Sequence, residues 1–334
     1  MRILLFGKNG QVGAEVEPLL RPLAAEGGGL AALDRAAADL ADPATVREAI
    51  RRERPDLVVN AAAFTAVDRA EAEPELARTV NATSVATMAG EVARLGGWLF
   101  HYSTDYVFDG TKAGAHVETD APAPLSVYGR TKLEGEEAIA ASGCRHLVFR
   151  TSWVYAARGT NFPRTILRLA RERPALSVID DQVGAPTAAS RIAAVTAAAI
   201  ARLAAGRPLE PGVYHLAAAG ATSWHGYAVR IVAAARAAGV PLAVPPEGVR
   251  AIPTAGYPQA ARRPANSRLD TTKLRTALGA DLPPWEDDLD PVLDFLCREI
   301  LGRDDAGREG SGCGDVGSDR VGREGPAAPT SAPR

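Results

Sequence analysis

Short apolar runs alternate with amphipathic stretches over the first 150 residues of the chain. Each run has the length of a β-strand and is almost continuously apolar, which is typical of strands buried on both faces of a parallel sheet. The runs predict strands at Ile3–Phe6, Leu30–Leu33, Leu57–Asn60, Trp98–Tyr102 and His146–Arg150. The stretches between them predict helices near residues 11–24, 43–54, 74–95 and 126–142. Strand and helix in this alternation indicate right-handed βαβ units, and hence an α/β fold with a doubly wound parallel sheet.

The pattern becomes less regular after residue 150. Thr187–Ala205 is predicted as a helix, and Val213–Leu216 as a short strand that returns to the main sheet. The stretches 151–186 and 219–301 carry many Pro and Gly residues and only isolated helices. We expect them to form a smaller α/β domain over the carboxyl ends of the strands, where open α/β sheets bind their ligands. The predicted sheet domain comprises residues 1–150, with 187–218 returning to it.

The last segment, residues 302–334, differs in composition from the rest of the chain. It is rich in Gly, Pro, Ser and paired charges, and it has almost nothing apolar to bury. Such a segment cannot offset the entropic cost of ordering by burying apolar surface. We therefore predict a disordered tail.

Composition excludes several classes of function. Forty acidic and 38 basic residues among 334 give a formal net charge of −2, so no field attracts nucleic acid or an anionic membrane. The apolar run Ile192–Ala201 is far shorter than the ~20 residues of a membrane span, and the apolar start of the chain is too short for a signal peptide. Three scattered cysteines, Cys144, Cys297 and Cys313, argue against a disulfide scaffold and a metal cluster. We expect a cytoplasmic protein.

A glycine-rich loop follows the first predicted strand and begins the first predicted helix. It reads Gly7-Lys8-Asn9-Gly10-Gln11-Val12-Gly13, and its glycines allow a tight turn and close approach to a pyrophosphate at the helix N-terminus. Glycines alone are a weak signal in a chain with 32 of them, but Asp34 at the end of the next strand strengthens it. The loop therefore predicts a Rossmann-type NAD(P) site. Asp34 suits a ribose hydroxyl, whereas Arg35 and Lys8 could accept a 2′-phosphate, so the choice between NADH and NADPH stays open.

Two further segments are candidates for the cofactor site. Asp39 and Leu40 could flank the adenine, and Ala61, Ala62 and Ala63 follow the third predicted strand. Small side chains there would let the backbone lie against the dinucleotide. The alanines are equally consistent with the alanine-rich composition of the chain.

Thr104, Tyr128 and Lys132 form the candidate catalytic set. Thr104 lies just past the predicted strand Trp98–Tyr102, and the four-residue spacing from Tyr128 to Lys132 puts phenol and ammonium on one helix face. An ammonium beside the phenol lowers its pKa from ~10, which would make Tyr128 a competent proton donor to a carbonyl that receives hydride. Tyr-x-x-x-Lys alone is common by chance. Here it follows a strand-end hydroxyl and a dinucleotide loop, and Lys132 is one of only four lysines.

These motifs resemble the extended short-chain dehydrogenases/reductases that act on nucleotide sugars, and more specifically the dTDP-4-dehydrorhamnose reductases. The resemblance extends from about residue 1 to residue 300. It is carried by GKNGQVG (7–13), NAAAFTAVDRAE (60–71), NAT (81–83), STDYVFDG (103–110), VYGRTKLEGE (127–136), FRTSWVY (149–155), DDQVGAPT (180–187), YHLAAAGATSWHGYA (214–228) and RRPANSRLD (262–270).

The resemblance implies reduction of the 4-keto group of dTDP-4-dehydro-6-deoxy-L-mannose to dTDP-L-rhamnose, a precursor of cell-surface polysaccharide, with hydride from NADPH or NADH. It implies that Tyr128 gives the proton and that Lys132 also binds the nicotinamide ribose. The residues implied for the sugar are Thr104, Asp105 and Trp153, and Arg263 and Asn266 are candidates for the diphosphate or nucleotide. Those implied for the cofactor are Gly10, Gln11, Val12, Asp34, Asp39, Leu40, Ala63, Phe64 and Thr65.

Several of these residues have a second interpretation. Trp153 could belong to the core, and Asp105 could only cap the next turn. Asn81 resembles the helix asparagine that holds a water beside the lysine in short-chain reductases, but it could be a plain N-cap. A surface salt bridge is an equal alternative for Arg263. The remaining candidates, His101, His215 and His225, show no metal-ligand spacing and are interpreted as packing or surface residues.

Mg²⁺ at a dimer contact is known in some members of the family and depends on glutamates. Glu15 is available, but the position after G-A-P-T that would supply a second carboxylate reads Ala188-Ala189-Ser190. Because a hard cation needs several oxygen ligands, we assign no residues to a metal, and bound Mg²⁺ and a homodimer are both left open.

Two other functions remain as alternatives. One is another nucleotide-sugar reductase or epimerase of the same superfamily. The other is a non-catalytic regulatory subunit of methionine adenosyltransferase, which has the same fold. The Thr104, Tyr128 and Lys132 set favours an enzyme, because a pure binding protein has no need of a proton donor.

Overall fold

The computed structural model describes residues 1–24 and 28–309. Its centre is a parallel six-stranded sheet with the strand order β10-β5-β4-β3-β1-β2. All strands predicted in the first 150 residues are present, and the predicted return strand joins the sheet beside β5. Their bounds are β1 Arg2–Phe6, β2 Gly29–Leu33, β3 Leu57–Asn60, β4 Trp98–Thr104, β5 Arg145–Thr151 and β10 Gly212–His215.

The sheet is buried on both faces, which explains the continuous apolar runs. In β1, Ile3 and Leu5 belong to one hydrophobic cluster, whereas Leu4 and Phe6 belong to another on the opposite face. The chain passes from β1 to β2 on one side and then returns to β3 on the other side of β1. This reversal makes the sheet doubly wound and confirms the predicted fold class. In such sheets the ligand crevice lies beyond the carboxyl ends of the strands at the reversal.

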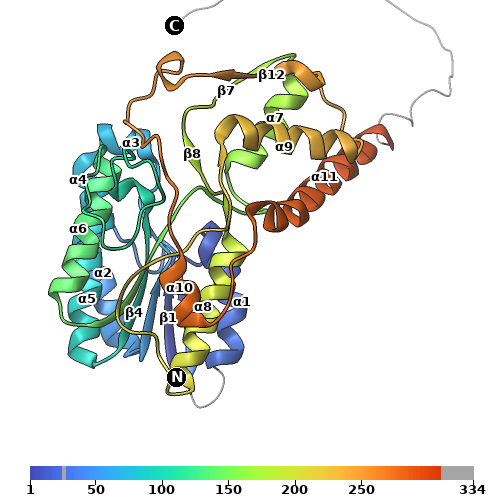
Figure 1. The fold of residues 1–334 in the computed structure, drawn as a ribbon. Helices are drawn as coiled ribbons and strands as arrows, with labels where there is room; N and C mark the ends of the chain where they lie inside the picture. The colour runs from blue at the N-terminus through green and yellow to red at the C-terminus, as the bar shows by residue number, and fades with distance from the viewer. Residues whose placement is uncertain (25–27, 310–334) are drawn as a thin grey trace, which may run out of the picture.

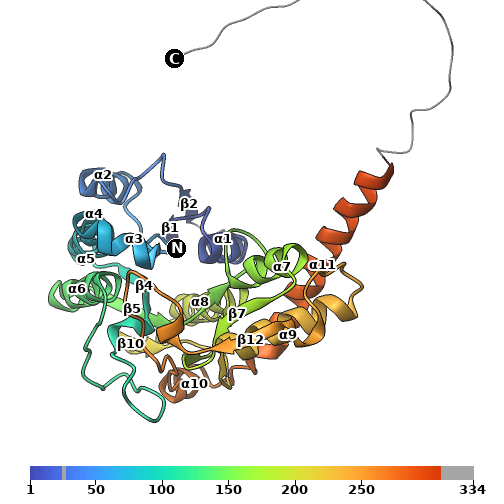
Figure 2. The same ribbon diagram turned by 90° about the horizontal axis from the view of Figure 1, so that it is seen from above.

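Helices cover the sheet on both sides (Figure 1, Figure 2). One face carries α1 and α8, whose Val16, Leu20, Ile192 and Ile200 share a cluster with the strands. The other face carries α2, α5 and α6. The bounds are α1 Gln11–Ala24, α2 Pro43–Glu53, α5 Ser84–Leu95, α6 Val127–Ala141 and α8 Ala189–Ala204.

The helix predicted near residues 74–95 is interrupted. The structure has α4 at Pro74–Arg78, a π-helical turn at Thr79–Thr83 and then α5. π-Helical turns inside α-helices are frequent at functional sites. The carboxamide of Asn81 in this turn clasps the backbone of Phe64, donating to its carbonyl oxygen over 3.1 Å and accepting from its N–H over 2.9 Å. Asn81 is therefore not an N-cap.

A second hydrophobic cluster lies beyond the carboxyl ends of the strands (Figure 1). It is rich in aromatic side chains, and we call Trp153, Tyr155, Phe162, Trp224, Tyr227 and Trp285 the aromatic cluster. The elements around it are α7 Phe162–Glu172, α9 Trp224–Ala237, α11 Trp285–Glu309 and the parallel pair β7 Leu176–Ile179 and β12 Val249–Ile252. Smaller pairs are β6 Val154–Tyr155 with β9 Thr187–Ala188, and β8 Val183–Gly184 with β11 Thr222–Ser223.

Several short elements were not predicted. Helix α7 was not predicted in the stretch 151–186, which carries many Pro and Gly residues. Its Pro163 lies in the first helical turn, where proline is compatible with a helix, and Asn161 caps it. Helix α10, Thr272–Leu278, lies in the late part of the chain, yet its Leu274 packs into the cluster under the sheet. The other elements that were not predicted are α3 Val67–Ala72, α11, the short strands β6 to β9, β11 and β12, and the 3₁₀ turns Asp105–Val107, Pro246–Gly248 and Thr254–Gly256.

The predicted start of the tail at residue 302 is wrong. Helix α11 continues through Glu309, so residues 302–309 are helical. Composition reflects what a segment can bury, but good helix formers such as Arg, Glu and Ala can extend an existing helix without burial. The rest of the predicted tail, residues 310–334, lies outside the described residues. Within the described ranges, no helix is both long and apolar enough to cross a membrane.

Candidate active site

A cleft of about 800 Å³ lies at the carboxyl edge of the sheet. It brings together segments from residue 7 to residue 224 of the chain. Of the predicted site residues, those that line it are Gly7, Gly10, Gln11, Val12, Asp34, Asp39, Leu40, Ala61, Ala62, Ala63, Thr65, Thr104, Asp105, Tyr128, Lys132 and Trp153. The residues that do not line it are Gly13, Arg263 and Asn266.

The glycine loop is packed so closely that side chains are excluded. Gly7 has φ of 81°, and a Cβ there would lie 2.8 Å from the Ala62 nitrogen. Gly13 does not line the cleft, and a Cβ there would lie 2.1 Å from the Gly7 carbonyl oxygen. Gly13 therefore acts through the shape of the loop and not through contact. The loop lines the cleft at the start of α1, where helix N-terminal N–H groups can bind a pyrophosphate.

Two ion pairs lie at the place where the adenosine ribose of the cofactor is expected. Lys8 Nζ lies 3.3 Å from Asp34 Oδ2, and Arg35 Nε lies 3.1 Å from Asp39 Oδ2. The Ala37 N–H, followed by Lys8, lowers the pKa of the Asp34 carboxyl below its usual range. Each cation that could accept a 2′-phosphate is thus already paired with a carboxylate of the same region.

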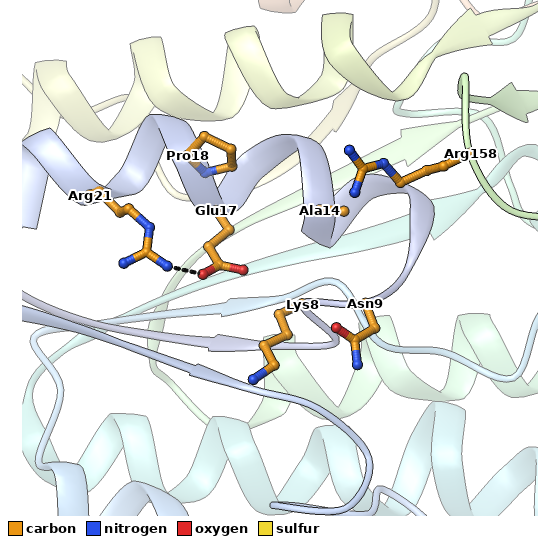
Figure 3. Close-up of a pocket in the computed structure, with 7 residues that line it drawn as sticks. All are labelled: Lys8, Asn9, Ala14, Glu17, Pro18, Arg21 and Arg158. Atoms are coloured by element: carbon orange, nitrogen blue, oxygen red, sulfur yellow. Dashed lines mark hydrogen bonds and ion pairs between the residues drawn. The ribbon is translucent and has the colours of Figure 1, made fainter. Parts of the chain in front are cut away.

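A smaller pocket of about 320 Å³ lies beside the loop against α1 (Figure 3). Its lining includes three cations, but each has an acidic neighbour. Arg21 pairs with Glu17, Lys8 pairs with Asp34, and Arg158 lies 4.0 Å from Glu15. The pocket therefore does not present uncompensated positive charge.

Tyr128 lies in the first turn of α6, which Ser126 caps by accepting the Gly129 N–H. A Cβ at Gly129 would lie 2.2 Å from the Tyr106 carbonyl oxygen, so only glycine lets this helix approach the 3₁₀ turn Asp105–Val107 so closely. Burial raises the pKa of Tyr128 to about 12, a hydrogen bond with Thr104 lowers it, and Asp105 raises it. The predicted lowering of this pKa is wrong. Burial of the phenol dominates its pKa, and the stabilisation of the phenolate by Lys132 stays a prediction.

Lys132 is buried one turn further along α6. Its Nζ donates to the Tyr102 carbonyl oxygen over 2.6 Å and lies 3.0 Å from His101 Nε2. Burial lowers the pKa of Lys132 to about 8, while Glu136 favours the ammonium. His101 is buried, in line with its interpretation as a packing residue, and it also contacts a proposed catalytic residue. Nothing in its spacing along the chain could have indicated this contact.

Asp105 is buried directly beside Thr104. Thr104 Oγ1 donates to Asp105 Oδ1 over 3.1 Å and accepts from the Tyr106 N–H over 3.2 Å. Burial raises the pKa of Asp105 to about 6, against hydrogen bonds from Ser267 and Thr104 that lower it. The capping group of the following turn is thus Thr104, and Asp105 is a buried acid at the edge of the cleft.

Trp153 faces the cleft in a strained conformation, with φ of 48°. Its ring stacks on Trp224 with centroids 3.6 Å apart and planes 13° from parallel. A Cβ at Gly184 would lie 2.7 Å from the Trp153 ring, which explains the glycine there. Trp224 also lines the cleft and was missed as a site residue, because only the fold brings it to Trp153.

Two predicted contacts with the nucleotide have other partners in the structure. Arg263 makes two hydrogen bonds to the Asp68 carboxylate, at 3.1 and 2.6 Å. Asn266 Nδ2 donates to the carbonyl oxygens of Lys112 and Gly114, and its Oδ1 accepts from Arg268. Arg263 thus connects its loop to α3, and Asn266 connects it to the loop at residues 112–114.

Within the described residues, no group of three or more His, Cys, Asp or Glu side chains could hold a metal ion. Glu15, the candidate magnesium ligand, lies beside Arg158.

Comparison with known proteins agrees with this geometry. The family model described as RmlD substrate binding domain matches residues 1–297. A dTDP-4-dehydrorhamnose reductase of Salmonella typhimurium is 52% identical over 290 residues, which make up 86% of this chain and 95% of that protein. The chain belongs to the dTDP-4-dehydrorhamnose reductase family.

Solved structures of dTDP-4-dehydrorhamnose reductases have the same fold. The Bacillus anthracis protein, in complex with NADP, has a TM-score of 0.76 and 30% identity, covering 90% of this chain and 99% of that one. The Clostridium acetobutylicum protein has a TM-score of 0.79 and 31% identity, covering 89% and 99%. As a member of this family, the chain is an oxidoreductase that uses a nicotinamide cofactor. Membership favours the reductase over both alternatives, the epimerase-like enzyme and the regulatory subunit.

Proposed function

We propose that this protein reduces the 4-keto group of dTDP-4-dehydro-6-deoxy-L-mannose to give dTDP-L-rhamnose, with Tyr128 as proton donor. The observation that carries the proposal is that Thr104, Tyr128 and Lys132 line one cleft together with the glycine loop. When bound, the reduced nicotinamide supplies the hydride. The protein has to hold the keto group still and to deliver a proton to its oxygen.

The proton donor is well suited to start the reaction. With its pKa at about 12, Tyr128 is protonated throughout the neutral range, so every enzyme molecule carries the proton. The hydrogen bond between Tyr128 and Thr104 places both hydroxyls on the same side of the cleft. Both can then contact one carbonyl oxygen. Once Tyr128 has given up its proton, the Lys132 ammonium one turn away stabilises the phenolate.

The sheet side of the cleft would hold the dinucleotide. The glycine loop would receive the pyrophosphate, Asp34 the adenosine ribose, and Ala61, Ala62 and Ala63 the backbone-lined path to the nicotinamide. Asn81 supports this path because its carboxamide fixes Phe64. Since both nearby cations are paired with carboxylates, we expect NADH and NADPH both to be accepted.

The opposite side would hold the sugar. Trp153, supported by Trp224, offers an apolar ring face to the hexose, and Thr104 and Asp105 offer polar contacts. Arg263 and Asn266 are left out of this assignment because their side chains are engaged with Asp68 and with loop carbonyls.

We further infer that residues 1–150 and 187–218 bind the cofactor, and that residues 151–186 and 219–301 bind the sugar. The two separate sets of hydrophobic clusters support this division, with α10 as a late helix that packs under the sheet. The buried free thiols Cys144 and Cys297 are in keeping with a reaction in the cytoplasm.

The direct test uses the purified protein with dTDP-4-dehydro-6-deoxy-L-mannose generated in the reaction mixture. NADPH and NADH are supplied separately, their oxidation is followed by absorbance, and the sugar product is identified. We expect oxidation of the cofactor with formation of dTDP-L-rhamnose. Cofactor binding without net oxidation would contradict the proposal and would indicate an epimerase-like cycle or a regulatory protein.

A further inference from the structure

His101 stands at the centre of a buried chain of polar side chains that the proposed mechanism does not use. It lies on β4, fully buried, between Asn60 of β3 and Lys132 of α6. Asn60 Nδ2 lies 3.1 Å from His101 Nδ1, and His101 Nε2 lies 3.0 Å from Lys132 Nζ. Each ring nitrogen therefore has one defined partner.

The backbone fixes the orientation of the Asn60 amide. Asn60 Oδ1 accepts the Ala62 N–H over 3.1 Å, and a backbone N–H can only donate. The other end of the amide, Nδ2, must then donate to His101 Nδ1. Burial and the nearby Lys132 hold the pKa of His101 well below its ordinary value, so the ring is neutral. A neutral ring that accepts at Nδ1 carries its proton on Nε2.

This proton points at Lys132. An ammonium has only donors and cannot accept the Nε2–H, whereas a neutral amine offers a lone pair. The His101 contact therefore favours the amine. Two other neighbours favour the ammonium: the Tyr102 carbonyl oxygen, and the Glu136 carboxylate, which is itself bound by Arg150 of β5. Lys132 is held between these opposing influences.

We propose that His101, oriented by Asn60, is a positioning residue that sets the proton affinity of Lys132 and thereby the alkaline limit of the reductase. The proposal rests on the proposed function, in which the Lys132 ammonium stabilises the phenolate of Tyr128. As pH rises and Lys132 loses its proton, that stabilisation is lost and turnover falls. Of the other titratable groups nearby, Tyr128 and Asp105 face Thr104, while Arg150 is paired with Glu136.

The first test is the pH profile of turnover for His101→Gln. A glutamine amide oxygen can take the place of Nε2 and accept from the ammonium, so it removes the opposing N–H. We expect the alkaline limb of kcat to move up by about one pH unit. The matched control is His215→Gln, the same change at a buried histidine on β10 that contacts the His116 carbonyl oxygen. The alkaline limb of kcat in this control should lie at the same pH as in the wild type.

A second variant tests the role of Asn60 without adding charge. In Asn60→Ser the hydroxyl can still accept the Ala62 N–H, but it does not reach His101, so the ring is free to turn its acceptor towards Lys132. The limb should again move to higher pH, by less than in His101→Gln. An unmoved or acid-shifted limb in both variants would overturn the proposal.

The tautomer can be read directly from the imidazole nitrogen chemical shifts of the wild-type protein, without any turnover. We expect a protonated Nε2 and an unprotonated Nδ1 at His101. The opposite tautomer overturns the proposal even if the enzyme is active. A wild-type protein that fails to turn over with either cofactor would contradict the proposed function, while the tautomer measurement still decides the arrangement of Asn60, His101 and Lys132.

Discussion

The two walls of the cleft are held in shape by different kinds of interaction. The sheet wall uses backbone shape and polar side chains at strand ends, as in the loop from Gly7 to Gly13 and the Thr104 hydroxyl. The opposite wall uses rings that hold one another by stacking, with Trp153 on Trp224 and Phe162 against Tyr227. Substitutions in the sheet wall should therefore affect turnover and cofactor binding. Substitutions in the opposite, aromatic wall should affect only binding of the sugar.

The largest effect is expected at Tyr128. Tyr128→Phe removes the proton donor and keeps the ring, so turnover should fall by the ~10²–10⁴-fold that a general acid contributes. The dissociation constant of the cofactor should hardly change. Rapid kinetics and a fluorescence titration of NADPH measure the two quantities. Undiminished turnover in this variant would remove Tyr128 from the mechanism.

A substitution at Gly13 tests whether the sheet wall binds the cofactor through the shape of its backbone. In Gly13→Ala the new methyl group would collide with the Gly7 carbonyl oxygen, and overpacking of this kind costs ~1–3 kcal/mol. We expect the cost to be divided between a lower melting temperature and weaker cofactor binding. Both are measured on the same sample.

The matched control is Gly90→Ala on α5, where a Cβ meets nothing within 4 Å. It should leave cofactor affinity unchanged and stabilise the protein by roughly 0.5–1 kcal/mol, because alanine is the better helix former. If both variants behave alike, the cofactor site does not depend on the close packing at Gly13.

The sheet wall could be predicted from the sequence largely because its parts are close in the chain. A loop between a strand and a helix, or a phenol and an ammonium four residues apart, has a geometry that follows from local structure. The doubly wound fold followed for the same reason, and the structure and the family both confirm it. The roles of Tyr128, Lys132 and Thr104 stay predictions, although the fold brings all three to one cleft.

The remaining features depend on contacts between distant segments. His101 meets Lys132 across 31 positions, and Trp153 meets Trp224 across the later part of the chain. No spacing rule connects such pairs. The same holds for Asn81, whose bond to Phe64 accompanies a π-helical turn in a stretch that periodicity alone assigns to one continuous helix.

A substitution of Trp224 tests the aromatic wall of the cleft. Trp224→Leu keeps apolar bulk under Trp153 but removes the stacked ring, which is worth ~0.5–1.5 kcal/mol. We expect KM for the sugar nucleotide to rise by roughly 2- to 12-fold, with the cofactor dissociation constant unchanged. Phe295→Ala on α11, where the ring is exposed, is the control and should change neither. A loss of cofactor affinity in Trp224→Leu would mean that the two walls are not independent.

The smallest expected effect is a loss of folding stability at acid pH, caused by a buried histidine of the central sheet. His215 is buried on β10, and burial lowers its pKa to about 3, whereas in the unfolded chain it titrates near ~6.5. Below ~6.5 the unfolded state binds more protons than the native state, so stability is greatest above that pH and falls as the solution becomes more acidic.

Between pH 7 and pH 6 the titration of His215 should lower the free energy of unfolding by about 0.7 kcal/mol. His215→Asn does not titrate, and its amide can still donate to the His116 carbonyl oxygen as Nδ1 does. Melting curves at pH 8, 7 and 6 should therefore show a constant difference between variant and wild type at the two higher values and a change in favour of the variant at pH 6. Parallel losses in the two proteins would mean that the acid sensitivity of the sheet does not come from His215. They would direct attention to His101 on β4, two strands away in the sheet, which is buried and neutral as well.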